Sequence, residues 1–284
     1  MVWIRRLVDG SLLAQADMDQ QSIDQFMELL DLDDGSSLRV FDVGQGEPIV
    51  FLPMSTELNF TYVPQIEEFK SDYRIILYEP RLSSQSHFGI ADRASEVVSL
   101  MKRLGLESTN IIAWSDTGSV AYYLSKRWPE KCRSIVFLGL ADRYTFPQPL
   151  RFLAQLYSDL PIEGLVPSWL IARILGKYLG GIQVKPAWVA GRAAQVPNLS
   201  CLFKHSVMPN LTEHQPVAGE VHVPCVVICG DKDALVSVAQ ARRMADLLPN
   251  ATQAVIIPGG EHFLGYVNGP AVNKVIREFY ACLA

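Results

Sequence analysis

A series of short apolar runs separated by helical patterns constrains the fold of this chain more than any other feature. The runs are expected to form strands near 48–53, 73–79, 109–114, 134–139, 224–229 and 253–258. Helices are expected between them, near 61–70, 91–104, 117–127, 237–248 and 269–281. Strands that are apolar along their whole length and alternate with helices are typical of a parallel sheet covered on both faces. With 284 residues, 49% of them hydrophobic, the chain can bury such a sheet, and the sequence predicts an α/β fold.

Reactive side chains follow three of these runs. Ser115 ends the third run and precedes a predicted helix, a setting in which a sharp turn lifts a serine hydroxyl clear of the sheet. Asp231 and Asp233 follow the fifth run, and His262 follows the last one. Taken singly, such a serine is more often a helix N-cap and such an aspartate a turn residue. The order Ser, Asp, His, each at the carboxyl end of a strand, instead favours a catalytic triad.

The same segments resemble the α/β hydrolase superfamily, from about residue 38 to the C-terminus. Ala-Trp-Ser-Asp-Thr-Gly around Ser115 resembles the Gly-Trp-Ser-Asp-Gly-Gly elbow of the branch that includes valacyclovir-hydrolase-like esterases. Gly230-Asp-Lys-Asp233 resembles the acid turn of the family, and Pro258-Gly-Gly-Glu-His262 resembles its histidine loop. The resemblance implies a mostly parallel sheet with helices on both faces. It also implies Asp233 as the acid, three residues after the glycine, and leaves Asp231 as a turn residue.

The loop expected to bind the oxyanion departs from the family pattern. The His-Gly of the family is replaced by Pro53-Met54, and the resemblance then places the oxyanion hole at the backbone N–H groups of Ser55 and Asp116. Proline fixes its own φ and has no N–H, so we expect a rigid loop. We also expect the Met54 side chain to narrow the cleft near Ser115.

The elbow departs from the pattern as well. Ala113 and Thr117 stand where the family has glycine on either side of the serine. Small residues suit this turn because the serine backbone is strained, and a β-branched threonine is expected to tighten or rotate it. These departures fit either an ordinary hydrolase that has drifted or a site retuned for another reaction.

The segment 142–221 breaks the alternation of strands and helices. Because the superfamily inserts its cap after the strand that corresponds to 134–139, we predict a helical cap at 142–221 and a core of 37–141 and 222–284. Most apolar residues of such a cap seal it onto the core, but a lid also turns an apolar face toward the ligand. The expected pocket is mostly apolar and is lined by Met54, Trp114, Tyr157, Trp169 and Trp188.

Residues 1–36 are interpreted as an N-terminal extension. Asp19–Leu30 is predicted to form an amphipathic helix, which packs either on the domain or on a partner. Its apolar residues at helical spacing are Ile23, Phe26, Met27 and Leu30. Leu38–Val43 is then expected to open a hairpin that turns at Gly44–Gly46.

Composition narrows the classes of partner and compartment. The formal net charge is −5 and no Lys/Arg cluster occurs, which argues against nucleic-acid binding. Five cysteines without metal-ligand spacing indicate a reducing compartment, so a cytoplasmic location is expected. No apolar stretch reaches the length of a membrane span. The sequence does not indicate an oligomeric state.

The sequence therefore predicts a serine hydrolase that cleaves an ester or thioester of a small-to-medium apolar carboxylic acid. Such an enzyme works through an acyl-enzyme and requires neither a metal nor an organic cofactor. Two alternatives remain open on the same scaffold. One is a non-hydrolytic enzyme, such as a lyase, a C–C bond-cleaving enzyme or a biosynthetic cyclase. The other is a ligand-binding receptor that has lost turnover.

Overall fold

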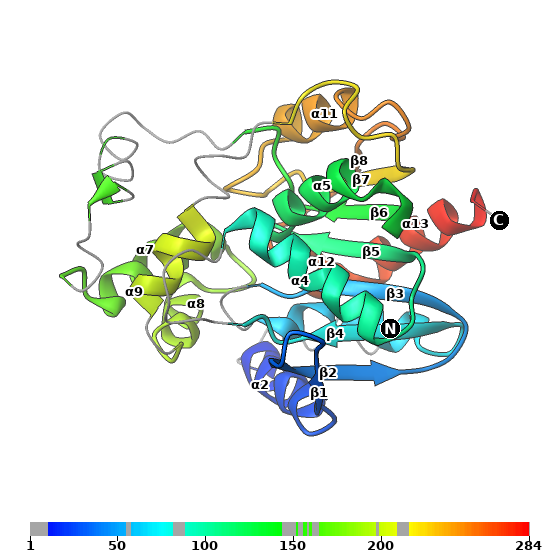
Figure 1. Ribbon diagram of the computed structural model, residues 1–284. Helices are drawn as coiled ribbons and strands as arrows, with labels where there is room; N and C mark the ends of the chain where they lie inside the picture. The colour runs from blue at the N-terminus through cyan, green and yellow to red at the C-terminus, as the bar shows by residue number, and fades with distance from the viewer. Residues whose placement is uncertain are drawn as a thin grey trace.

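The computed structural model describes residues 11–54, 58–81, 89–143, 152, 156–157, 159–160, 165–196, 199–208 and 216–283 (Figure 1). These residues form one eight-stranded sheet in the order β1-β2-β4-β3-β5-β6-β7-β8. The strands are β1 (Glu28–Asp31), β2 (Ser37–Val43), β3 (Glu47–Leu52), β4 (Tyr73–Tyr78), β5 (Thr109–Trp114), β6 (Cys132–Leu138), β7 (Cys225–Gly230) and β8 (Val255–Ile257). Strand β2 is antiparallel to both β1 and β4, and the pairs from β4 to β8 are parallel.

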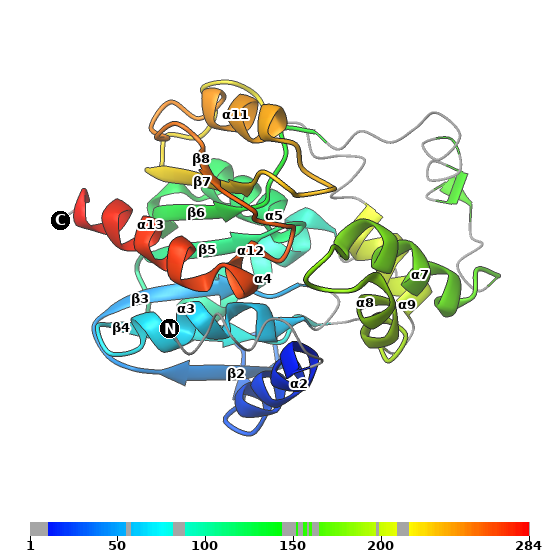
Figure 2. The same ribbon diagram turned by 180° about the vertical axis from the view of Figure 1, so that it is seen from behind.

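Helices cover both faces of this sheet, as its apolar strands require. One layer consists of α4 (Ile90–Arg103), α5 (Thr117–Arg127) and α11 (Val238–Asp246), seen in front of the sheet in Figure 1. The other consists of α3 (Val63–Phe69), α12 (Leu264–Val267) and α13 (Gly269–Ala281), seen in front in Figure 2. Every residue of β5 and of β7 is buried. The predicted α/β hydrolase fold is confirmed.

Further helices lie beside the sheet, between β6 and β7 in the chain. They are α7 (Ser168–Leu179), α8 (Pro186–Ala193), α9 (Leu199–Leu202) and the π-helical turn Phe203–Val207. Figure 1 shows α7, α8 and α9 at the edge where β5 and β6 end. They occupy the described part of the segment predicted as a cap. Short 3₁₀ turns at Asn59–Tyr62 (η1) and Pro129–Lys131 (η2) complete the elements.

The prediction of a hairpin that turns at Gly44–Gly46 is wrong. Strand β2 hydrogen-bonds to β1 and β4, whereas β3 pairs with β4 and β5, so β4 lies between β2 and β3. The connection instead crosses the amino end of β4. Gly44 has φ 81°, and a Cβ at this position would collide with the carbonyl oxygen of Tyr73. The glycine therefore serves a close backbone crossing rather than a two-strand turn.

The helix predicted over Asp19–Leu30 is displaced toward the N-terminus. Helix α2 spans Ser11–Asp24, and Leu30 lies in the edge strand β1. Ile23 is buried, but Phe26 is 61% exposed, so the expected apolar face is not used as one surface. The backbone ladder from Glu28–Val40 to Asp31–Ser37 overrides the helical periodicity at these residues. No helix in the described ranges is both long and apolar enough to cross a bilayer.

Candidate active site

Ser115 occupies a strained turn between β5 and α5. Its φ is 55°, and among the described residues it is the one non-glycine residue with positive φ. Its N–H donates to the carbonyl of Leu138, at 2.9 Å, and its own carbonyl accepts from the N–H of Gly118, at 3.0 Å. These bonds fix the left-handed conformation, which a non-glycine residue adopts only at an energetic cost. The turn therefore has the conformation expected of a nucleophile elbow.

Thr117, which replaces a family glycine, closes this turn with its side chain. Its hydroxyl accepts a hydrogen bond from the N–H of Trp114, at 2.8 Å, and donates to the carbonyl of Trp114, at 2.9 Å. The side chain is fully buried. The threonine thus supplies local polar partners at the end of β5, so its extra bulk is accommodated by hydrogen bonds.

His262 connects Ser115 to Asp233. The distance from His262 Nε2 to Ser115 Oγ is 2.8 Å, and that from His262 Nδ1 to Asp233 Oδ2 is 2.9 Å. The second carboxylate oxygen, Oδ1, accepts from the N–H groups of Leu235 and Val236, at 2.8 and 2.9 Å. Ser115 is only 4% exposed and His262 2%. The carboxylate is therefore fixed on both oxygens, and the histidine ring has little freedom to rotate.

Asp231, the alternative acid, has a different role. Its Oδ1 accepts from the N–H of Gly259, at 2.7 Å, and so joins the acid turn to the histidine loop. In the described part of the chain, Asp233 and not Asp231 makes the hydrogen bond to His262. The structure places Asp231 as a turn residue.

The histidine loop is also held by its neighbours. Trp114 Nε1 donates to the carbonyl oxygen of His262, at 2.8 Å. On the other side, the Glu261 carboxylate accepts from the N–H groups of Ile182 and Gln183, at 2.7 and 3.0 Å. Residues 182 and 183 lie in the connection between α7 and α8, so Glu261 joins these helices to the residue beside His262. Sequence reasoning did not identify this role of Glu261.

Neither of the two predicted oxyanion donors is tested by the structure. Asp116 is the N-cap residue of α5, and its donor role stays a prediction, whereas Ser55 lies outside the described residues. A buried arginine that sequence reasoning missed contacts both segments. Arg93 Nη1 donates to Asp116 Oδ2, at 2.8 Å, and Arg93 Nη2 donates to the carbonyl of Pro53, at 3.1 Å. The signal available in the sequence was an arginine on the apolar face of the helix at 91–104.

The N-terminal helix α2 packs on the domain beside this site. Gln20 Oε1 accepts from the N–H of Phe60 in η1, at 3.0 Å, and Asp19 Oδ2 accepts from the hydroxyl of Tyr266 in α12, at 2.7 Å. Both bonds are buried. Phe60 stacks on Phe263, and α12 follows His262 in the chain, so the extension contacts two segments next to the histidine loop.

The side chains predicted to line an apolar pocket are not all brought together. Met54, Trp114 and Tyr157 are buried in one apolar cluster, and Trp188 packs against that cluster. Trp169, in contrast, is 58% exposed on α7. Met54 therefore contributes to the core, and its effect on the cleft stays a prediction.

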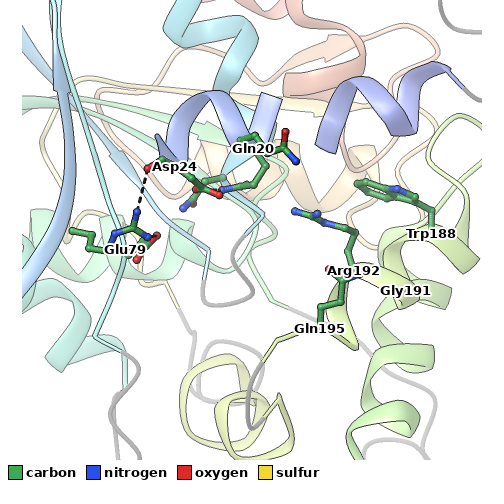
Figure 3. A pocket seen from close by; sticks show the side chains of 10 residues that line it. Gln20, Asp24, Glu79, Trp188, Gly191, Arg192 and Gln195 are labelled. Carbon is green, nitrogen blue, oxygen red and sulfur yellow. Dashed lines mark hydrogen bonds and ion pairs between the residues drawn. The ribbon is translucent and has the colours of Figure 1, made fainter. Parts of the chain in front are cut away.

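A cleft of about 660 Å³ opens between α2 and α8 (Figure 3). Its lining is largely polar, and of the predicted pocket residues it includes Trp188. The Trp188 ring packs edge-on against Phe60 with centroids 5.4 Å apart, and Phe60 stacks on Phe263 with centroids 6.3 Å apart. Two aromatic side chains thus connect the wall of this polar cleft to the residue after His262. In the part of the chain that the structure describes, no three His, Cys, Asp or Glu side chains are grouped as a metal site.

Comparison with known proteins agrees with this architecture. The α/β hydrolase fold family matches residues 52–268. A Synechocystis protein that carries the name of a non-heme chloroperoxidase is 26% identical over 84% of this chain and 92% of its own length.

Two solved structures have similar folds. The meta-cleavage product hydrolase of Pseudomonas fluorescens IP01 has a TM-score of 0.72 at 17% identity, over 90% of this chain and 98% of that one. A thermophilic esterase from Thermogutta terrifontis has a TM-score of 0.74 at 16% identity, again over 90% and 98% of the two chains. At these identities the two structures bear on the fold alone.

Proposed function

Because the chain belongs to the α/β hydrolase fold family, we propose that it is a serine hydrolase acting through Ser115, His262 and Asp233. Its substrate is an ester or thioester of a small-to-medium apolar carboxylic acid. The observation that carries the proposal is the continuous hydrogen-bonded chain from Ser115 Oγ through both ring nitrogens of His262 to Asp233. A serine hydroxyl is a weak nucleophile at neutral pH, and this arrangement provides the base that activates it.

The proposal gives each of the three side chains a role. His262 Nδ1–H donates to Asp233, which leaves Nε2 free to take the Ser115 proton as Oγ attacks the acyl carbon. The protonated imidazole then gives this proton to the leaving alcohol or thiol. Asp233 stabilises the imidazolium and holds the ring in the required tautomer. Water repeats the sequence on the acyl-enzyme and releases the acid.

Charge on the carbonyl oxygen must be stabilised as the tetrahedral intermediate forms. We assign this to the backbone N–H groups of Asp116 and Ser55. One such donor is typically worth about 10²–10³ in rate. Asp116 supports the assignment because it begins the turn into α5, directly after the serine.

Support for the class of substrate comes from the surroundings of Ser115. Trp114, directly before the serine, lies in a buried apolar cluster, which suits an apolar acyl group. Free thiols at all five cysteines support the cytoplasmic location proposed from the sequence.

A fluorophosphonate probe tests the proposal directly. It phosphonylates only an activated serine, so wild-type protein should be labelled at Ser115, and neither Ser115→Ala nor His262→Ala should be labelled. Ser119, buried on α5 one turn away, offers a control, because Ser119→Ala should keep the label. If the folded wild-type protein stays unlabelled, the serine hydrolase proposal is wrong. The non-hydrolytic enzyme or the receptor would then take its place.

A further inference from the structure

The cleft of about 660 Å³ between α2 and α8 lies outside the proposed catalytic triad. Ser115, His262 and Asp233 are not among the described residues that line it. Its lining comes instead from α2, α8 and η1, and from Arg39 in β2 and Glu79 after β4 (Figure 3). A volume of this size falls within the range of roughly 300–1,000 Å³ that is typical of sites for small molecules.

Asn59 is the most deeply buried of the described residues that line the cleft. It is 2% exposed, and its Oδ1 is buried without a hydrogen-bond partner in the protein. A buried polar atom without a partner costs free energy, so nearly all such atoms in folded proteins are paired. Because no bond holds Oδ1, the amide can rotate and offer its oxygen or its NH₂ group to a ligand in the cleft.

The formal charges of the described lining cancel. Two of its residues are carboxylates, Asp24 and Glu79, and two are guanidinium groups, Arg39 and Arg192. Arg39 Nη1 donates to Glu79 Oε1, at 2.7 Å, and Arg39 Nη2 donates to the carbonyl oxygen of Asp24, at 3.1 Å. The Asp24 carboxylate accepts from Gln20 Nε2, at 2.8 Å. Sites for ions are lined by an excess of the opposite charge, so this lining favours a ligand without net charge.

Amide side chains and one indole make up most of the remaining lining. The amides are those of Gln20, Gln21, Asn59 and Gln195. An amide both donates and accepts hydrogen bonds, and this matches a hydroxyl group, which does the same. Trp188 is half-buried, contacts Phe60 and lines the cleft. The negative face of an aromatic ring attracts C–H groups, such as those on the apolar face of a sugar ring.

We propose that this cleft binds a neutral mono- or disaccharide. The hydroxyl groups of the sugar hydrogen-bond to the amides and carboxylates of the lining, and one face of its ring packs on Trp188. A nucleoside matches the lining less well, because its base presents two apolar faces and Trp188 is the one aromatic side chain among the described lining residues. The site goes beyond the proposed hydrolase function and does not depend on it.

Isothermal titration calorimetry of the wild-type protein with glucose and maltose tests the class of ligand. At least one of these sugars should bind with a Kd of about 1 mM or below. Adenosine, citrate and spermidine serve as a nucleoside, an anion and a cation. Binding of any of these three without binding of either sugar overturns the proposal. So does the absence of sugar binding at concentrations up to about 10 mM.

Two substitutions locate the bound sugar. Asn59→Leu replaces the amide by an apolar group of similar size and should weaken sugar binding by about 3–10-fold, as expected for lost hydrogen bonds between neutral groups. Trp188→Leu should weaken it by about tenfold, through loss of the ring. Trp169→Leu is the matched control, because Trp169 is 58% exposed on α7 and is not among the described lining residues. Wild-type affinity in both Asn59→Leu and Trp188→Leu overturns this location.

Thermal unfolding separates a binding role of Asn59 from a structural one. Because Oδ1 has no partner in the protein, Asn59→Leu should unfold at or above the melting temperature of the wild type. Asn273→Leu is the comparison, since the amide of this similarly buried residue accepts from Gln65 and donates to the carbonyl oxygen of Pro64. It should lower the melting temperature by about 2–6 °C. An equal decrease in Asn59→Leu would show that Asn59 is structural and would overturn its role in binding.

Discussion

The indole Nε1 of Trp114 donates a 2.8 Å hydrogen bond to the carbonyl oxygen of His262. The residue before the proposed nucleophile therefore holds the loop that carries the proposed base. The Trp114 ring also packs against Phe263, with centroids 4.8 Å apart. Both contacts fix the backbone of the histidine loop relative to the elbow.

Trp114→Phe should retain the ring packing and lose the hydrogen bond. We expect kcat to fall by roughly tenfold, because small displacements of a base are costly, while the melting temperature changes little. Steady-state kinetics and thermal unfolding check this. Trp128→Phe, at the far end of α5, should leave kcat unchanged. An unaffected kcat in Trp114→Phe would show that the loop is positioned without this bond.

The roles of the two aspartates can be separated by isosteric changes. Asp233→Asn should lower kcat by about 10³–10⁴-fold, because the amide favours the wrong histidine tautomer. Asp231→Asn should stay within about threefold in kcat, since it weakens only the bond to Gly259, although it should lower stability by about 1 kcal/mol. The test is kcat/KM for both variants together with urea unfolding. The reverse ranking would move the acid to Asp231.

The hydrogen bonds of Glu261 should hold the α7–α8 connection against the histidine loop. Glu261→Ala should lower the free energy of unfolding by about 1.5–3 kcal/mol, as expected for lost hydrogen bonds to a charged group. The amide protons of Ile182 and Gln183 should exchange faster with solvent. Glu67→Ala removes an exposed carboxylate of α3 and should change stability by no more than about 0.5 kcal/mol.

A second change, in the α7–α8 connection, tests the same contact with Glu261. A Cβ on Gly181 would collide with the Glu261 carboxylate, so Gly181→Ala should produce the same increase in amide exchange. Unchanged exchange in both variants would show that the connection is held by other contacts.

The cysteines should differ sharply in reactivity. Burial raises the pKa of the Cys132, Cys225 and Cys229 thiols to about 12. Only the thiolate is alkylated, so these residues should be inert to iodoacetamide at pH 8 and react as the pH approaches 12 or the protein unfolds. Cys282 is exposed and should be modified first. Mass spectrometry of the alkylated peptides, before and after denaturation, gives the order. Early labelling of Cys225 would contradict the buried strand β7.

Local sequence patterns predicted individual helices of the core and the order of the three candidate catalytic residues. The predicted ranges 117–127 and 269–281 coincide with α5 and α13, because each follows a clear strand or loop signal and has an apolar face. The ordering of Ser115, Asp233 and His262 was readable for the same reason, since each side chain follows its own apolar run. The structure then brings these three side chains together.

The prediction that failed near the N-terminus, and the contacts that sequence reasoning missed, depend on pairing between elements. Leu30 has helical spacing, yet its backbone pairs with Leu38 in the next strand, and the helical periodicity gives no sign of this pairing. The bond from Arg93 to Pro53 spans 40 residues, and that from Glu261 to Ile182 spans 79. Such contacts depend on how strands and helices pack in three dimensions. A single sequence shows at most a charged residue on an apolar face and does not identify its partner.

The left-handed backbone conformation of Ser115 also lowers the free energy of unfolding of the protein. A non-glycine residue in this region costs on the order of 1–3 kcal/mol, which the rest of the fold must offset. Alanine at this position removes the hydroxyl and retains the strain, whereas glycine removes both. Reactivity and thermal robustness are thus opposed at a single residue. The inactive variant Ser115→Gly is therefore suited to trapping bound substrate. Selection of random mutants for stability alone would tend to favour replacement of Ser115, and with it loss of the proposed activity.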